Sequence, residues 1–208
     1  KWLKISLNGV KENDFAMILG FPGRTNKFYT SWEVAERRDI DNSVRIKIRD
    51  IRQKVMLEEM MRDPQVRIQY ASKYASSTNA HKNAIGSNWA INKRNFEKVK
   101  LDVQDKLTAW SKQNNKPEYI VAMQALKQIV TDRKDLRFRS WMLHEALIRG
   151  IEFTGIPTEV DPIIDALKKK DQKAIKEQLT LLNMAYKRFN NKDYSAAVDK
   201  KIAKALLK

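Results

Sequence analysis

The sequence predicts a mainly α-helical protein, with long antiparallel helices in a bundle, short C-terminal helices and a short N-terminal β segment. Charged residues make up 32% of the 208 residues, while Gly and Pro number only 6 and 5, a composition typical of long solvated helices. From Asp39 onward, apolar residues recur every three or four positions, which is the period of an α-helix. The first 30 residues instead alternate between apolar and polar side chains, which favours strands.

The N-terminal segment has the pattern of two strands followed by a turn. Leu3, Ile5 and Leu7 alternate with polar residues, and residues 15–19 form a short apolar run. Pro22 and Gly23 suit the second and third positions of a type II turn. Because two strands are not stable alone in water, we expect residues 1–30 to need further strands, and residues 31–208 to form a separate helical domain.

The first long helix is expected to begin near Asp39 and to end at Asp63. Asp41 or Asn42 can act as its N-cap, and Pro64 is suited to the first position of the helix that follows. That second helix is expected to reach the break at residues 114–117. Gly86 is a candidate kink or break within it, and Ile85 and Trp89 are expected on its buried stripe. Later helices are expected to start at Pro117, near Pro162, after Asp171 and at residues 191–193.

Composition excludes several kinds of chemistry. The chain has no Cys, so it can form no disulfide, thiolate zinc site or Cys nucleophile. No run approaches the roughly 20 apolar residues that cross a bilayer, so we expect no membrane partner. Only two His are present, and His144 lacks the second His of an H-E-x-x-H site. We therefore expect no metal and no cofactor, and His144 to be a partly buried helix residue.

The net charge of +16 raises the possibility of a polyanionic partner. Residues 168–208 hold 12 Lys and Arg against 4 Asp and Glu. Apolar residues recur at helical spacing between these lysines, which favours an amphipathic helix with a solvated basic face. A basic helical module that binds nucleic acid or an acidic protein is the alternative function, although nucleic acid is the less favoured partner.

Catalytic motifs are missing from the chain, but one polar interval is a candidate binding site. Gly86 and Ser87 are not part of a G-x-S-x-G nucleophile elbow, and no phosphate-binding loop follows Gly20. Between residues 76 and 83, small hydroxyl and amide side chains replace the apolar spacing of the helix. Such an interval indicates either a solvated helix face or a ligand-binding face, and His81 within it could act as a general base.

Three stretches resemble one family of bacterial exopeptidases. Residues 9–25 read GVKENDFAMILGFPGRT, residues 67–77 read RIQYASKYASS, and residues 79–86 read NAHKNAIG. In order and spacing these stretches are similar to the bacterial dipeptidyl-peptidase 7 and 11 family of serine peptidases. Weaker similarity continues through Lys187, residues 192–194 and residues 199–201, so the resemblance covers nearly the whole chain.

The resemblance implies that this chain is one part of a larger hydrolase. The family has a chymotrypsin-like double β-barrel with a His-Asp-Ser triad, and a helical domain inserted between the barrels roofs the active cleft. Residues 1–30 would be the last strands of the first barrel, and residues 31–208 would be the helical capping domain. The triad segments of the family are absent from the sequence, so no catalytic residue is expected in this chain, and the fragment should be inactive alone. The start at Lys1 without Met also suggests an excised piece.

The resemblance also implies a substrate-binding residue. The family motif N-Y-W-K-N-x-I-G aligns with residues 79–86, and its leading Asn, which matches Asn79, binds the free α-amino group of the peptide substrate. His81, Lys82 and Asn83 are possible neighbours in that site. Ala80 and His81 replace the aromatic pair of the family, which also leaves open a noncatalytic paralogue that binds peptides or serves a structural role.

For the parent protein, the resemblance implies a homodimer located in the periplasm or at the cell surface, or secreted, in a Gram-negative bacterium. The expected partners of the parent are the peptide N-terminus and the flanking barrels. The resemblance also implies that the second barrel largely sets the preference for substrate side chains.

Overall fold

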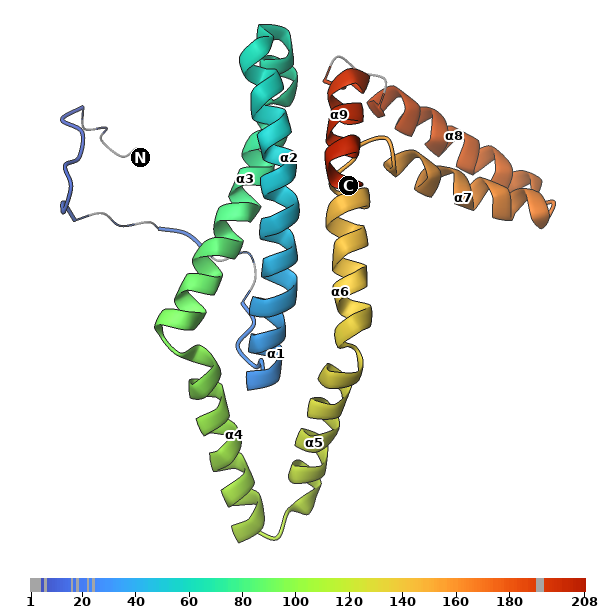
Figure 1. The fold of residues 1–208 in the computed structure, drawn as a ribbon. Helices are drawn as coiled ribbons and strands as arrows, with labels where there is room; N and C mark the ends of the chain where they lie inside the picture. Colours follow the sequence, from blue (N-terminus) through green and yellow to red (C-terminus); the bar gives the residue numbers. More distant parts are fainter. Residues whose placement is uncertain are drawn as a thin grey trace.

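A computed structural model describes residues 5, 7–15, 17, 19–21, 23, 25–189 and 193–208, with the helical residues 156–159, 185, 188 and 189 described by their backbone only. The described chain is mainly helical, as the sequence predicts (Figure 1). Its helices are α1 (Ser31–Glu36), α2 (Ser43–Arg62), α3 (Pro64–Lys93), α4 (Phe96–Gln113), α5 (Pro117–Asp132), α6 (Lys134–Leu143), α7 (Gly155–Lys168), α8 (Gln172–Phe189) and α9 (Ala196–Leu206). Two π-helical segments, η1 (Arg37–Asn42) and η2 (His144–Ile148), follow α1 and α6.

The N-terminal segment extends away from the helices (Figure 1). Among its described residues none forms a strand, and Ile5, Leu7, Phe15 and Phe21 are exposed. The predicted β segment is therefore not confirmed in the described residues. Leu3 and Pro22, on which the strand pattern and the turn partly depended, lie outside the described residues.

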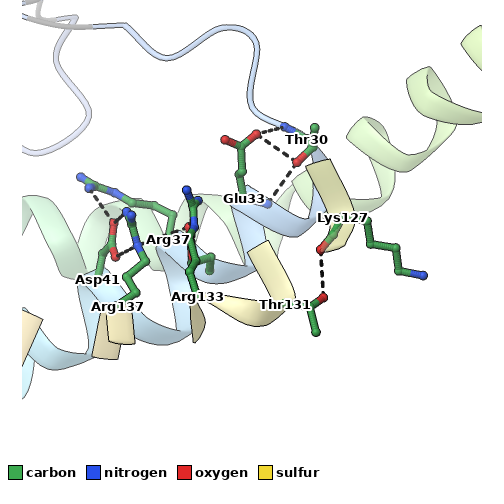
Figure 2. A network of polar contacts seen from close by, with 9 residues as sticks. Thr30, Glu33, Arg37, Asp41, Lys127, Thr131, Arg133 and Arg137 are labelled. Carbon is green, nitrogen blue, oxygen red and sulfur yellow. Dashed lines mark hydrogen bonds and ion pairs between the residues drawn. The ribbon is translucent and has the colours of Figure 1, made fainter. Parts of the chain in front are cut away.

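The first helix begins earlier than the apolar pattern predicts. Thr30 Oγ1 accepts a hydrogen bond from Glu33 N at 3.3 Å, and the Glu33 carboxylate accepts one from Thr30 N at 2.9 Å, which makes a capping box before Ser31 (Figure 2). The prediction that Asp41 or Asn42 caps the long helix is met in position only, because Asn42 is the N-cap residue of α2 but its side chain makes no capping hydrogen bond. Both residues are fully buried inside η1, where the carboxylate of Asp41 pairs with arginines.

Helices α2 and α3 form the long antiparallel pair of the molecule (Figure 1). The boundary between them is the predicted one, because Asp63 accepts a hydrogen bond from Gln65 N at 2.8 Å and Pro64 occupies the first turn of α3. On α3 the buried residues are spaced by seven positions, at Tyr70, Ser77 and Ala84. This narrow seam packs on α2, while α3 also contacts η1 and α4.

Helix α3 continues through Gly86 and ends at Lys93, so the chain does not break at Gly86. The break lies at Asn95, which has a left-handed φ of 45°. Asn adopts this conformation more readily than most residues because its short side chain can hydrogen-bond locally. The next break is the predicted one, with Asn115 at φ 52° before Pro117 starts α5.

Helix α9 packs against α2 and completes the main apolar cluster, which contains Met56, Tyr70, Ile151, Val198 and Ile202. The buried carboxylate of Asp199 accepts hydrogen bonds from Glu152 N and Phe153 N, both at 2.9 Å. Lys73 on α3 reaches Glu152 at 2.7 Å. These contacts fix α9 and the turn before α7 to the α2–α3 pair.

Helices α7 and α8 pack against each other and project from the body as a second antiparallel pair (Figure 1). The structure confirms that Asp171 caps α8, since its carboxylate accepts a hydrogen bond from Ala174 N at 3.0 Å. Pro162 does not start a helix and instead lies inside α7, which begins at Gly155. The last helix begins after Ser195, and most of the expected start at residues 191–193 lies outside the described residues.

Tyr70 links stability to alkaline pH. Burial raises the pKa of its phenol well above the usual value near 10, and the nearby Glu152 carboxylate acts in the same direction. Above about pH 10 the phenol loses its proton in the unfolded state but keeps it in the folded state. The free energy of unfolding therefore falls by up to about 1.4 kcal/mol per pH unit. Between about pH 9 and pH 11, urea denaturation of Tyr70→Phe should therefore show a smaller loss of unfolding free energy than the unmodified chain.

The matched control for loss of a hydroxyl is Tyr119→Phe, because Tyr119 is 44% exposed on α5. Identical pH slopes for the unmodified chain and Tyr70→Phe would contradict a role for the buried phenol.

Candidate functional site

Asn79 lies on an exposed polar face in the middle of α3. Between residues 72 and 86, the exposed residues that share this face at helical spacing are small or polar, namely Ser72, Ala75, Ser76, Asn79, Lys82, Asn83 and Gly86. Ser76 and Asn83 lie one turn before and one turn after Asn79, so their hydroxyl and amide groups flank its amide. The structure thus brings Asn79, Lys82 and Asn83 to one surface, as a site in the polar interval requires.

The opposite side of the same helical turn is anchored to α2. Ser77 is 2% exposed, and its Oγ accepts a hydrogen bond from Gln53 Nε2 at 3.0 Å. Successive residues of a helix are rotated by about 100°, so Asn79 points about 200° away from Ser77. The burial of Ser77 therefore determines that Asn79 faces outward.

A buried carboxylate extends this anchor to a distant segment of the chain. Glu145 on η2 is 3% exposed, and its two oxygens accept from Arg45 Nε at 3.1 Å and from Arg49 Nε at 2.8 Å. Arg49 also donates from Nη1 to the backbone oxygen of Ser77 at 3.2 Å. Three segments, α2, α3 and η2, meet directly behind the exposed face.

His81 is placed apart from Asn79. Its side chain is 12% exposed, and its Nε2 lies 3.0 Å from Oδ1 of Asp50 on α2. The two atoms are close enough for an ion pair when the imidazole is protonated, but they are not aligned for a hydrogen bond. Among the predicted neighbours of Asn79, Lys82 and Asn83 therefore share its surface, whereas His81 packs toward α2.

A second group of ion pairs, with buried carboxylates, joins α1 and η1 to the junction of α5 and α6. Arg133 binds the carboxylate of Glu36 with two hydrogen bonds of 2.9 and 2.6 Å. Arg137 binds Asp41 with two of 2.8 and 2.7 Å, and Arg37 lies 3.4 Å from Asp41 (Figure 2). The sequence analysis did not predict this group. Its only local signal is the four-residue spacing of Arg133 and Arg137.

These contacts surround a polar pocket of about 170 Å³ lined by Tyr29, Glu33, Glu36, Arg37, Asp41, Arg133 and Arg137. Hydrogen bonds to the carboxylates raise the pKa of Arg133 and Arg137. Three acidic and three basic side chains balance each other there, so the pocket is a structural junction without a net attraction for ions.

His144 is the first residue of η2. His144 packs its ring edge-on against Trp141, with centroids 6.2 Å apart. Among the described residues, no three His, Asp or Glu gather in a way that could hold a metal ion. Likewise, none of the described helices combines the length and apolar character that crossing a bilayer requires.

Comparison with known proteins finds relatives that are named dipeptidyl-peptidases. The chain is 49% identical to the Asp/Glu-specific dipeptidyl-peptidase of Porphyromonas gingivalis and 40% identical to dipeptidyl-peptidase 7 of Phocaeicola vulgatus, with 100% of this chain and 29% of each relative covered. The crystal structure of Porphyromonas endodontalis DPP11 in complex with the dipeptide Arg-Glu matches with a TM-score of 0.71 at 40% identity, covering 100% of this chain and 30% of that one.

The family model described as Peptidase S46 matches residues 1–208. The chain therefore belongs to the peptidase S46 family, which confirms the resemblance read from residues 9–86. It spans less than a third of the length of these relatives.

The anchor behind Asn79 can be tested by its effect on stability. Ser77→Ala removes the acceptor of Gln53 Nε2, and Gln53 is itself buried. A buried donor without a partner costs about 1–3 kcal/mol, so the unfolding free energy measured in urea should fall by about that amount. Ser76→Ala removes an exposed hydroxyl from the adjacent residue and should stay within about 0.5 kcal/mol of the unmodified chain. Equal effects of the two variants would refute the anchor.

Proposed function

We propose that this chain is the substrate-gating helical domain of a serine dipeptidyl-peptidase that releases dipeptides from peptide N-termini. In this proposal Asn79 binds the free α-amino group of the substrate. The observation that carries the proposal is the exposed position of Asn79 on a polar face whose opposite side is anchored to α2.

The chemistry of the face suits an N-terminal ammonium group. A side-chain amide oxygen accepts hydrogen bonds, and the ammonium group supplies up to three donors. A hydrogen bond to a charged group contributes about 1.5–3 kcal/mol, which is enough to favour free N-termini over blocked or internal peptide segments. Held by a domain that covers a cleft, this contact would limit the enzyme to cutting near the end of a peptide.

The hydrolytic step is proposed to take place in the remainder of the parent protein. A serine would attack the peptide carbonyl after a histidine removes its proton, with an aspartate orienting the histidine. Membership of the peptidase S46 family and relatives named as dipeptidyl-peptidases support a peptidase parent. Because the chain spans less than a third of those relatives, we propose that it has no hydrolytic activity alone.

Peptide is the ligand that the structural relatives support. The similar DPP11 structure was determined with the dipeptide Arg-Glu, a molecule of the size that a dipeptidyl-peptidase releases. For the parent of this chain we propose the same class of ligand, together with the homodimeric state and the periplasmic or cell-surface location that the family resemblance implies. The alternative function, a basic helical module that binds nucleic acid or an acidic protein, is supported by the net charge of +16 alone. The alternative of a noncatalytic paralogue is supported by the replacement of the aromatic pair by Ala80 and His81.

The proposal is tested with Asn79→Ala in the full-length parent peptidase. Loss of a hydrogen bond to a charged group should lower kcat/KM for dipeptide release from free N-termini by about 10- to 100-fold. The measurement is the initial rate of release from chromogenic dipeptidyl substrates over a range of concentrations. Unchanged kcat/KM would remove Asn79 from the binding site.

Asn92→Ala is the matched control, because Asn92 is an exposed asparagine on α3 but lies on a different face from Asn79. It should keep the kinetics of the unmodified enzyme.

A further inference from the structure

We infer that Glu145 is a positioning residue for substrate binding, acting through Arg49 and Ser77 on the face of α3 that carries Asn79. The inference rests on the proposed function of Asn79. Glu145 lies 96 residues beyond Arg49 in the sequence and belongs to η2. It can influence the exposed face only through the helices between them.

The first step is the pairing of one buried carboxylate with two arginines. The side chains of Arg45 and Arg49 are only 15% and 14% exposed, and Glu145 is the carboxylate that both contact. Arg45 also stacks on the ring of Trp141 at 4.6 Å, which limits its freedom to turn away. If Glu145 loses its charge, two largely buried guanidinium groups one helical turn apart remain without compensation, and such a change is costly.

The second step joins Arg49 to α3. Its Nη1 donates to Ser77 O, while the Nε of the same guanidinium group donates to Glu145. The planar fork of Arg fixes the directions of its donors relative to each other. The position of the Glu145 carboxylate therefore determines where the Ser77 carbonyl is held, and Gln53 holds the hydroxyl of the same residue.

The third step connects this turn to Asn79. Ser77 and Asn79 belong to the same turn of α3, so a shift or rotation of the helix at Ser77 moves the Asn79 amide by a similar amount. Misplacement of a binding group by about 1 Å can cost about 100-fold in rate.

The test is a double-mutant cycle in the full-length parent peptidase, combining Glu145→Gln with Asn79→Ala. Glu145→Gln keeps the size of the side chain but removes the charge, and it should raise KM for free N-terminal substrates by about 5- to 10-fold with a smaller change in kcat. Adding Glu145→Gln to Asn79→Ala should cause no further increase in KM, because Glu145 acts through the group already removed. Arg49→Lys, which keeps the charge but loses the fork, should give the same pattern and serves if Glu145→Gln does not fold.

Glu36→Gln is the matched control. Glu36 is likewise a buried carboxylate, 4% exposed, between two arginines, but it lies at the junction of α1 with α5 and α6. It should lower the midpoint of thermal unfolding and leave KM unchanged, which separates positioning from general stability.

The outcomes distinguish the two claims. If Asn79→Ala has no effect, the proposed function fails. If Asn79→Ala raises KM but Glu145→Gln and Arg49→Lys leave KM unchanged, the proposed function stands and the positioning role of Glu145 is overturned. The same conclusion follows if the increase in KM caused by Glu145→Gln or Arg49→Lys multiplies with the increase caused by Asn79→Ala.

Discussion

Buried carboxylates shared between paired arginines hold the helices of this chain in their relative positions. Glu145 joins η2 to α2, and the Glu36 and Asp41 carboxylates join α1 and η1 to the arginines at the junction of α5 and α6. Each contact bridges nearly 100 residues of sequence. The free energy of desolvation offsets most of the attraction within a buried ion pair, so the pair adds little net stability. Removing one partner is nevertheless strongly destabilising, because it leaves a buried charge without a partner. Their geometry therefore selects one arrangement of helices over others.

The need for such contacts follows from the shape of the molecule. The main apolar cluster is confined to the region where α2, α3 and α9 meet, while α4 and α5 extend away from it (Figure 1). Apolar packing alone is non-directional and would allow long, thin helices to slide or rotate. Bidentate arginine pairs have a fixed geometry, so they supply the orientation that a small core does not. Two of the three carboxylates, Asp41 and Glu145, lie in π-helical segments, which are often found at functional positions.

Local signals allowed much of the secondary structure to be predicted from the sequence. Pro64, Pro117 and Asp171 mark helix starts because each acts on the backbone within one turn, and the structure confirms them. The capping box of Thr30 and Glu33 is an equally local signal that was overlooked. The long-range arginine pairs could not be predicted, since they depend on how distant segments pack.

The buried side of α3 could be predicted only in part. The apolar pattern placed Ile85 and Trp89 in the core, but both are exposed, at 46% and 62%. Small residues lie in the seam instead, because Ser77 and Ala84 allow α2 to approach closely. The outward direction of Asn79 and the inward position of His81 both follow from this seam. Once the seam is known, ordinary helical geometry explains the candidate site.

The same seam bears on the proposed role of Asn79 in substrate binding. A binding group can select a free N-terminus only if its own position is well fixed. The substrates differ by the presence of one ammonium group, and a small displacement of the binding group would lose the contact with it. An exposed asparagine on an unsupported helix would not meet that condition. Here the turn that carries Asn79 is held through both the hydroxyl and the carbonyl of Ser77, by Gln53 and Arg49. Rigid support behind an otherwise open polar face is what a gating surface requires, and in this chain the support depends on a carboxylate that lies far away in the sequence.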